Sequence, residues 1–136
     1  MKLSSQSRDM LIKELSYCRK RILEEPTLIR KTLFYGGMIG KIYSIRNTEY
    51  DPELNFMNYI LGSSYNALKN YFEEEQSFEL PKIFFDKLCE YLEQLETKIK
   101  NKENTYTILE KILNLSMTAD VYGYYLFEKG ELKIED

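Results

Sequence analysis

Apolar residues recur every three or four positions in five stretches of the chain, which is the spacing of one face of an α-helix. The stretches cover residues 5–24, 26–46, 52–74, 81–100 and 105–129, and short polar segments separate them. This pattern predicts an all-α, single-domain bundle of about five antiparallel amphipathic helices over residues 1–130. Residues 131–136 then form a short C-terminal tail.

Four of the five predicted helices carry one clear apolar stripe, which we expect to face the core. The stripes are Leu11, Leu15, Cys18 and Ile22; Leu54, Met57, Leu61, Tyr65, Leu68 and Phe72; Phe85, Leu88, Leu92, Leu95 and Ile99; and Ile108, Ile112, Leu115, Ala119, Tyr122 and Leu126. The fourth helix follows the heptad spacing of a coiled-coil seam.

The segment 26–46 differs because it is apolar nearly all round, which predicts a central helix. Its expected inward stripe is Ile29, Leu33, Gly36 and Gly40. Each glycine in a helix costs about 1 kcal/mol of helix propensity relative to alanine. We therefore expect a neighbouring helix to approach the glycines closely, and a break at Gly36-Gly37 is the alternative.

Turn and capping residues indicate where the helices begin. Pro26 suits the first position of the second helix, and Asp51-Pro52 reads as the N-cap and first position of the third. Thr107 and Glu110 have the spacing of a capping box for the fifth helix, and Thr105 is the alternative N-cap.

Residue types exclude several classes of enzyme. The chain has no histidine, so a Ser-His-Asp or Cys-His mechanism cannot operate within it. The glycines before Lys41 do not form a phosphate loop, because the spacing is wrong and Ile42 stands where Ser or Thr is required. We favour a non-enzymatic protein without a cofactor, and an enzyme that acts through Asp, Glu, Tyr, Lys or Cys is the alternative.

Carboxylates are the remaining candidates for a chemical site. Glu49, Asp51 and Glu53 cluster around one turn, where they could hold a hard cation or serve the start of a helix. No segment matches the calcium-binding loop of EF-hands, so we expect no metal. Asp120 is the carboxylate expected to be buried, with a perturbed pKa.

The cysteines and the N-terminal segment bear on location. Cys18 and Cys89 are far apart and not in metal-ligand spacing, so we expect two buried, reduced thiols. The first residues lack the apolar run of a signal peptide, and no later run is long enough to span a bilayer. The sequence therefore predicts a cytoplasmic protein without a membrane partner.

Charge is distributed unevenly along the chain. Residues 1–46 carry a net charge of +6 and residues 47–136 a net charge of −9. Basic residues interleaved with tyrosines over residues 8–46 suggest binding of nucleic acid, as an alternative to pairing with acidic helices of this chain or of another copy. The basic set is Arg19, Lys20, Arg21, Arg30, Lys31, Lys41 and Arg46.

Twelve tyrosines and no tryptophan are typical of surfaces that are half buried and half wet. Our preferred hypothesis is a helical interaction, scaffold or regulatory module that forms a homo-oligomer, with another protein as the alternative partner. The expected oligomer interface is Gly36, Gly40, Tyr122, Tyr124 and Tyr125.

Overall fold

The structure, a computed structural model, describes residues 1–73, 80–119 and 128–130. Over these ranges the chain forms five α-helices and no strand. The helices are α1 (Ser5–Glu24), α2 (Leu28–Thr48), α3 (Pro52–Glu73), α4 (Leu80–Lys100) and α5 (Tyr106–Ala119). The predicted all-α bundle is confirmed. Asp120 and most of the tail fall outside the described residues.

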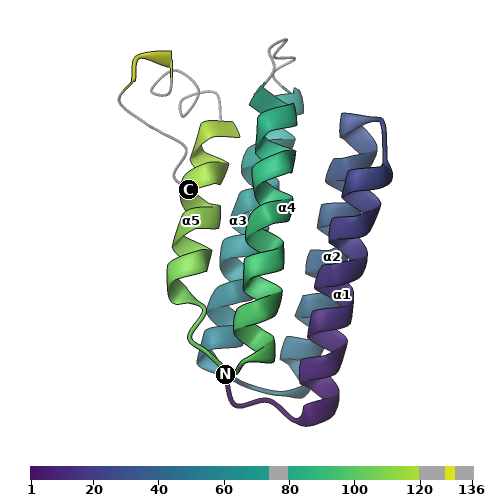
Figure 1. The fold of residues 1–136 in the computed structure, drawn as a ribbon, viewed down its shortest axis with the longest axis vertical. Helices are drawn as coiled ribbons and strands as arrows, with labels where there is room; N and C mark the ends of the chain where they lie inside the picture. Colours follow the sequence, from purple (N-terminus) through teal and green to yellow (C-terminus); the bar gives the residue numbers. More distant parts are fainter. Residues whose placement is uncertain (74–79, 120–127, 131–136) are drawn as a thin grey trace.

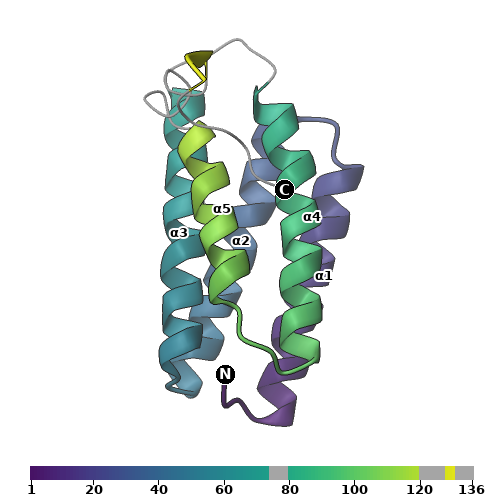
Figure 2. The same ribbon diagram turned by 60° about the vertical axis from the view of Figure 1, so that its left-hand side comes forward.

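The five helices stand side by side in a closed ring, in the order α1, α2, α3, α5, α4 and back to α1. Consecutive helices run antiparallel, whereas α3 and α5 lie next to each other and run in the same direction (Figure 1, and turned in Figure 2). The parallel pair is a consequence of the odd number, because five helices in a ring cannot all alternate in direction.

One continuous core fills the centre of the ring. The stripes predicted for α1, α4 and α5 are buried wherever their side chains are described, and in α3 Leu54, Met57, Leu61 and Leu68 are buried while Tyr65 is partly buried. Cys18 and Cys89 belong to this core as free thiols, and burial raises the pKa of Cys18 to about 12 and that of Cys89 to about 11. Both cysteines therefore act as small buried hydrophobes.

The face of α2 that packs on the core is the opposite of the predicted one. Ile29 and Leu33 are 65% and 60% exposed, and the buried residues of this helix are Thr32, Tyr35, Met38, Ile42 and Ile45. The prediction was wrong because a helix that is apolar all round offers no contrast between an inner and an outer side. The helix also lies in the ring rather than at its centre, and it is unbroken at Gly36-Gly37.

Gly36 allows a close contact between α2 and α3. A Cβ atom at this position would lie 2.8 Å from Cε2 of Tyr65, a distance that real Cβ contacts do not reach. One residue earlier in each helix, the buried Tyr35 hydroxyl donates a hydrogen bond of 2.8 Å to the Ser64 hydroxyl. The close neighbour predicted for the glycines is thus a tyrosine ring, and it concerns Gly36 alone.

Asp51 links the start of α3 to the N-terminal segment. One carboxylate oxygen accepts a hydrogen bond from the Leu54 backbone N–H at 3.0 Å, as expected of an N-cap, and the other accepts from the Lys2 N–H at 2.9 Å. Burial opposes ionisation, yet these N–H groups hold the pKa of the Asp51 carboxyl below its usual range.

Glu49 and Glu53 bind the residues at the starts of α1 and α5. Glu49 accepts hydrogen bonds from the backbone N–H and the hydroxyl of Ser4, the N-cap of α1, at 2.8 and 3.0 Å. Glu53 lies 3.1 Å from the Met1 amine and accepts from the N–H and hydroxyl of Thr105 at 3.0 and 2.6 Å. The three carboxylates of this turn therefore bind hydrogen-bond donors and serve helix starts.

Two predicted helix starts are corrected by local hydrogen bonds. Pro26 precedes α2, because the Glu25 carboxylate accepts from both the N–H and the hydroxyl of Thr27 and this turn delays the helix to Leu28. Helix α5 begins directly after Thr105, so the proposed capping box at Thr107 lies inside the helix.

The contact at Gly36 predicts a difference between two glycine-to-alanine substitutions. Gly36→Ala gains about 1 kcal/mol of helix propensity but overpacks against Tyr65, which costs about 1–3 kcal/mol. Gly62→Ala in α3 is the matched control, since its Cβ meets nothing within 4 Å. We expect urea unfolding to show Gly62→Ala stabilised and Gly36→Ala neutral or destabilised; equal gains in both would contradict the contact.

The lowered pKa of Asp51 predicts a loss of stability in acid. A carboxyl whose pKa is lowered by folding stabilises the protein above its ordinary pKa of 3.8, and this stabilisation disappears as the pH falls. We expect Asp51→Ala to lose about 1–2 kcal/mol at pH 7. Asp51→Asn should also be less stable than wild type at pH 7, because its amide nitrogen cannot accept the second N–H bond, and it should show a shallower loss of free energy of unfolding below about pH 4. Identical acid profiles of wild type and Asp51→Asn would count against this role.

Candidate interaction groove

The outer face of α2 carries one stripe that changes in bulk along the helix. Ile29, Leu33, Gly37, Gly40 and Ser44 follow one another at intervals of four, four, three and four residues, which places them on one side of the helix. Added Cβ atoms at Gly37 and Gly40 would meet nothing within 4 Å. The stripe therefore projects at the beginning of α2 and is flat in its second half.

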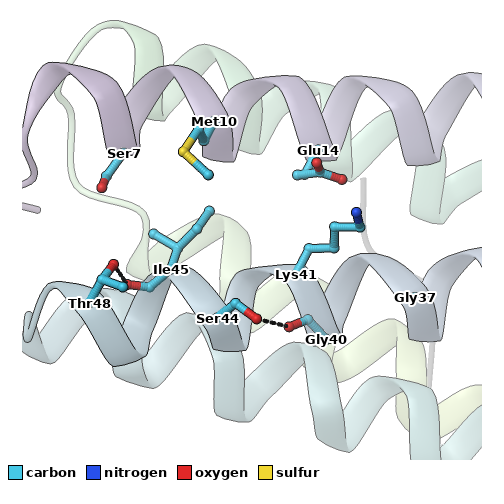
Figure 3. A pocket seen from close by; sticks show the side chains of 9 residues that line it. All are labelled: Ser7, Met10, Glu14, Gly37, Gly40, Lys41, Ser44, Ile45 and Thr48. Atoms are coloured by element: carbon cyan, nitrogen blue, oxygen red, sulfur yellow. Dashed lines mark hydrogen bonds between the residues drawn. The ribbon is translucent and has the colours of Figure 1, made fainter.

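A hollow of about 530 Å³ lies over the flat half, between α1 and α2 (Figure 3). Its lining consists of Ser7, Met10 and Glu14 from α1 and of Gly37, Gly40, Lys41, Ser44, Ile45 and Thr48 from α2. The hydroxyls of Ser44 and Thr48 turn back onto carbonyls of their own helix, at 3.3 and 2.8 Å. The floor is therefore smooth and weakly polar.

A smaller hollow of about 150 Å³ continues the same depression toward the α1–α2 connection. It shares Glu14, Gly37 and Lys41 with the first hollow and ends near Leu33 and Arg21. Together the two form one groove, which we call the α1/α2 groove. From Leu33 to Thr48 it follows the helix for roughly 22 Å at 1.5 Å per residue.

Two opposite charges mark the middle of the α1/α2 groove. Figure 3 shows the Glu14 carboxylate and the Lys41 ammonium pointing toward each other from the two helices. Farther along, the Arg21 guanidinium lies 4.5 Å from the ring centre of Phe34 and 5.7 Å from that of Tyr17. Charged groups at the rim of an apolar groove fix the orientation of a binding partner, in addition to the apolar area that the groove offers.

The basic residues considered for nucleic acid do not gather on one face. Arg19 turns toward α4, where its Nε lies 2.8 Å from Glu96 and its guanidinium 3.9 Å from Glu93. The bond to Glu96 is the main reason why the pKa of Arg19 is raised. Arg19 of α1 thus pairs with acidic residues of α4 inside the chain.

The other members of that set are dispersed. Arg30 lies 3.7 Å from Glu25, and Lys31 donates to the Ile22 carbonyl at the end of α1. Lys41 and Arg21 line the α1/α2 groove, Lys20 is exposed on α1, and Arg46 lies at the other side of α2.

The residues expected at an oligomer interface divide in the same way. Gly40 lies open in the α1/α2 groove, whereas Gly36 faces Tyr65 of the same chain. Tyr122, Tyr124 and Tyr125 fall outside the described residues. Sequence reasoning missed Gly37, Met10 and Ser44. Gly37 and Ser44 could have been found from the spacing of the apolar stripe on α2, but that stripe was predicted to face the core.

Other kinds of site find no support in the described ranges 1–73, 80–119 and 128–130. No three His, Cys, Asp or Glu side chains there are grouped so that they could hold a metal ion. None of the helices in those ranges combines the length and the apolarity needed to cross a membrane.

No known protein-family model, curated protein or solved structure matches this chain.

Proposed function

We propose that this protein is a non-enzymatic helical module that associates with a second copy of itself through the α1/α2 groove. The carrying observation is that α2 is apolar on both sides, while the described chain covers only one of them. Ile29 and Leu33 project from the uncovered side beside a hollow with a smooth floor. Contiguous apolar surface of this kind is typical of an interaction site.

The stripe on α2 is self-complementary, which favours a second copy over a different protein. If two α2 helices pack antiparallel about a two-fold axis between Gly37 and Gly40, Leu33 of each copy falls opposite Ser44 of the other. In the same register Ile29 falls opposite Thr48, and Gly37 opposite Gly40. Each projecting half therefore meets the flat half of the other copy, as a two-fold interface requires.

The glycines supply close approach at the axis of this arrangement. Without side chains at Gly37 and Gly40, two helix backbones pack nearer than the usual 8–10 Å spacing would otherwise demand. Glu14 and Lys41 flank the axis, so each lies within reach of the opposite charge on the other copy. The propensity lost at two helical glycines is then offset by the contact they allow.

Residue chemistry elsewhere supports a binding role in the cytoplasm. The chain has no histidine to serve as a general base near neutral pH. Its two cysteines are free and buried, which suits the reducing cytoplasm in which we expect the protein to act.

The first test is to fill the groove without disturbing the fold. Gly40→Arg places a long side chain over the hollow, and its Cβ has free space in the single chain, so the helix gains propensity. Gly62→Arg on α3 is the matched control. By light scattering we expect twice the chain mass of 16.3 kDa for wild type and Gly62→Arg, and the mass of one chain for Gly40→Arg. A wild-type monomer at high micromolar concentration would rule out the proposal.

The register is tested by cross-linking two different variants. A Leu33→Cys chain mixed with a Ser44→Cys chain should form an intermolecular disulfide on mild oxidation, because these positions face each other across the axis. Leu33→Cys alone should cross-link poorly, since its two copies lie roughly 16 Å apart along the helices. The native cysteines are buried and should not interfere. Equal yields in all mixtures would disprove this register.

A further inference from the structure

A second hollow, of about 690 Å³, lies on the other side of α2, where this helix meets α3 and the start of α5. We call it the tyrosine hollow. Its volume is within the range of roughly 300–1,000 Å³ that is usual for ligand pockets. The lining residues used below are Tyr43 and Arg46 of α2, Asn55, Asn58 and Tyr59 of α3, and Tyr106 of α5. None of them lines the α1/α2 groove.

Three tyrosine rings line this hollow and are exposed to solvent. Tyr59 is 70% exposed, Tyr43 51% and Tyr106 40%. The ring of Tyr106 packs against Phe56 with the ring centres 5.3 Å apart and the planes tilted by 55°. Tyrosines that are exposed on one side and supported on the other form a platform on which a flat group can stack.

Arg46 brings a positive charge to the same hollow. Its Nε donates to the Asn55 side-chain oxygen, one terminal nitrogen donates to the Asn47 side-chain oxygen at 3.4 Å, and the guanidinium carbon lies 5.3 Å from the ring centre of Tyr43. These partners are neutral amides and a ring. Among the described residues Arg46 has no ion pair, so its charge is fixed in position and not neutralised.

The neighbouring carboxylates do not cancel this charge through direct contact. Glu49 and Asp51 lie between α2 and α3 and Glu53 lies in the first turn of α3. Each is already bonded to the N-terminal segment, and Glu53 also to the start of α5. An anion at Arg46 therefore meets a guanidinium that has no carboxylate partner among the described residues.

The two asparagines add one donor and one acceptor. Asn58 donates through its Nδ2 to the Ile39 carbonyl at 3.2 Å, which leaves its Oδ1 as an acceptor. Asn55 accepts from Arg46 through its Oδ1, which leaves its Nδ2 as a donor. Asparagine amides in this state suit the polar edge of a nucleobase.

We propose that the tyrosine hollow binds a nucleobase together with its phosphate, either as a mononucleotide or as one unit of a single strand. The base stacks on the exposed ring of Tyr59, its edge meets the asparagine amides, and the phosphate lies at Arg46. The positively charged guanidinium favours this ligand over a proline-rich peptide, which also seeks aromatic grooves but carries no phosphate.

The test measures binding of defined probes to the full chain. Adenosine and uridine monophosphates and fluorescent octamers of single-stranded RNA and DNA are titrated at low and moderate salt, beside a duplex and a proline-rich peptide. We expect octamer binding with a slope of log affinity against log salt of about −0.7, the value for one phosphate contact to a single strand. Monophosphates that bind as tightly as octamers identify a mononucleotide site, and octamers that bind alone identify a strand site.

Three variants separate the contributions. Tyr59→Ala should weaken binding by about 5- to 100-fold through lost stacking, whereas Tyr59→Phe keeps the ring and the affinity. Arg46→Gln should weaken binding and flatten the salt dependence. Lys20→Gln removes an exposed lysine of α1 and should change neither. Helical circular dichroism and melting temperature confirm that each variant is folded.

Clear outcomes overturn the proposal. These are undetectable binding of every nucleotide probe at low salt, affinity unaffected by both Arg46→Gln and Tyr59→Ala, or binding of the proline-rich peptide in preference to all nucleotides. Gly40→Arg should leave nucleotide binding intact, because Gly40 does not line this hollow. Failure of the dimer proposal and failure of this one are therefore distinguishable.

Discussion

Three carboxylates at the junction of α2 and α3 hold the starts of α1, α3 and α5. Glu49 holds the N-cap of α1, Asp51 caps α3 and ties down Lys2, and Glu53 holds the start of α5. Hydrogen bonds from N–H groups to ionised carboxylates are strong and directional, and Asp51 is shielded from water. The alignment of three helices at one end of the bundle follows from this turn, and with it the position of α2 between α1 and α3.

How far the sequence predicted this fold depended on contrast between the two sides of each helix. The stripes of α1, α3, α4 and α5 separate apolar from polar positions, and the core stripes predicted for them are buried or partly buried wherever the structure describes them. In α2 both sides are apolar, so spacing alone could not tell Tyr35, which packs inside, from Leu33, which projects outward. Helix α2 starts later than Pro26 because Thr27 donates hydrogen bonds to the Glu25 side chain, and the spacing of apolar residues cannot predict such a bond.

The candidate surfaces were less predictable, because they depend on which residues the ring brings together. The sequence showed basic residues near tyrosines, but only the fold shows that Arg19 is paired with Glu96 and that Arg46 lines one hollow with Tyr59 and Tyr106 of two other helices. The sequence does not distinguish Gly36 from Gly37 and Gly40. In the structure Gly37 and Gly40 face open space, whereas Gly36 faces Tyr65. Helix α2 thus serves as a shared wall, with the α1/α2 groove on one side and the tyrosine hollow on the other.

The parallel pairing of α3 with α5 bears on how the chain folds. Short connections join α1 to α2 and α2 to α3, so these pairs form at a small entropic cost of loop closure. The bonds that close the ring join residues far apart in the sequence: Glu53 with Thr105 are 52 residues apart, and Arg19 with Glu96 are 77 apart. Contacts of such separation form slowly relative to local ones. We therefore expect ring closure by α4 and α5 to be the late, entropy-limited step of folding, with the core open along one side of α3 until α5 docks.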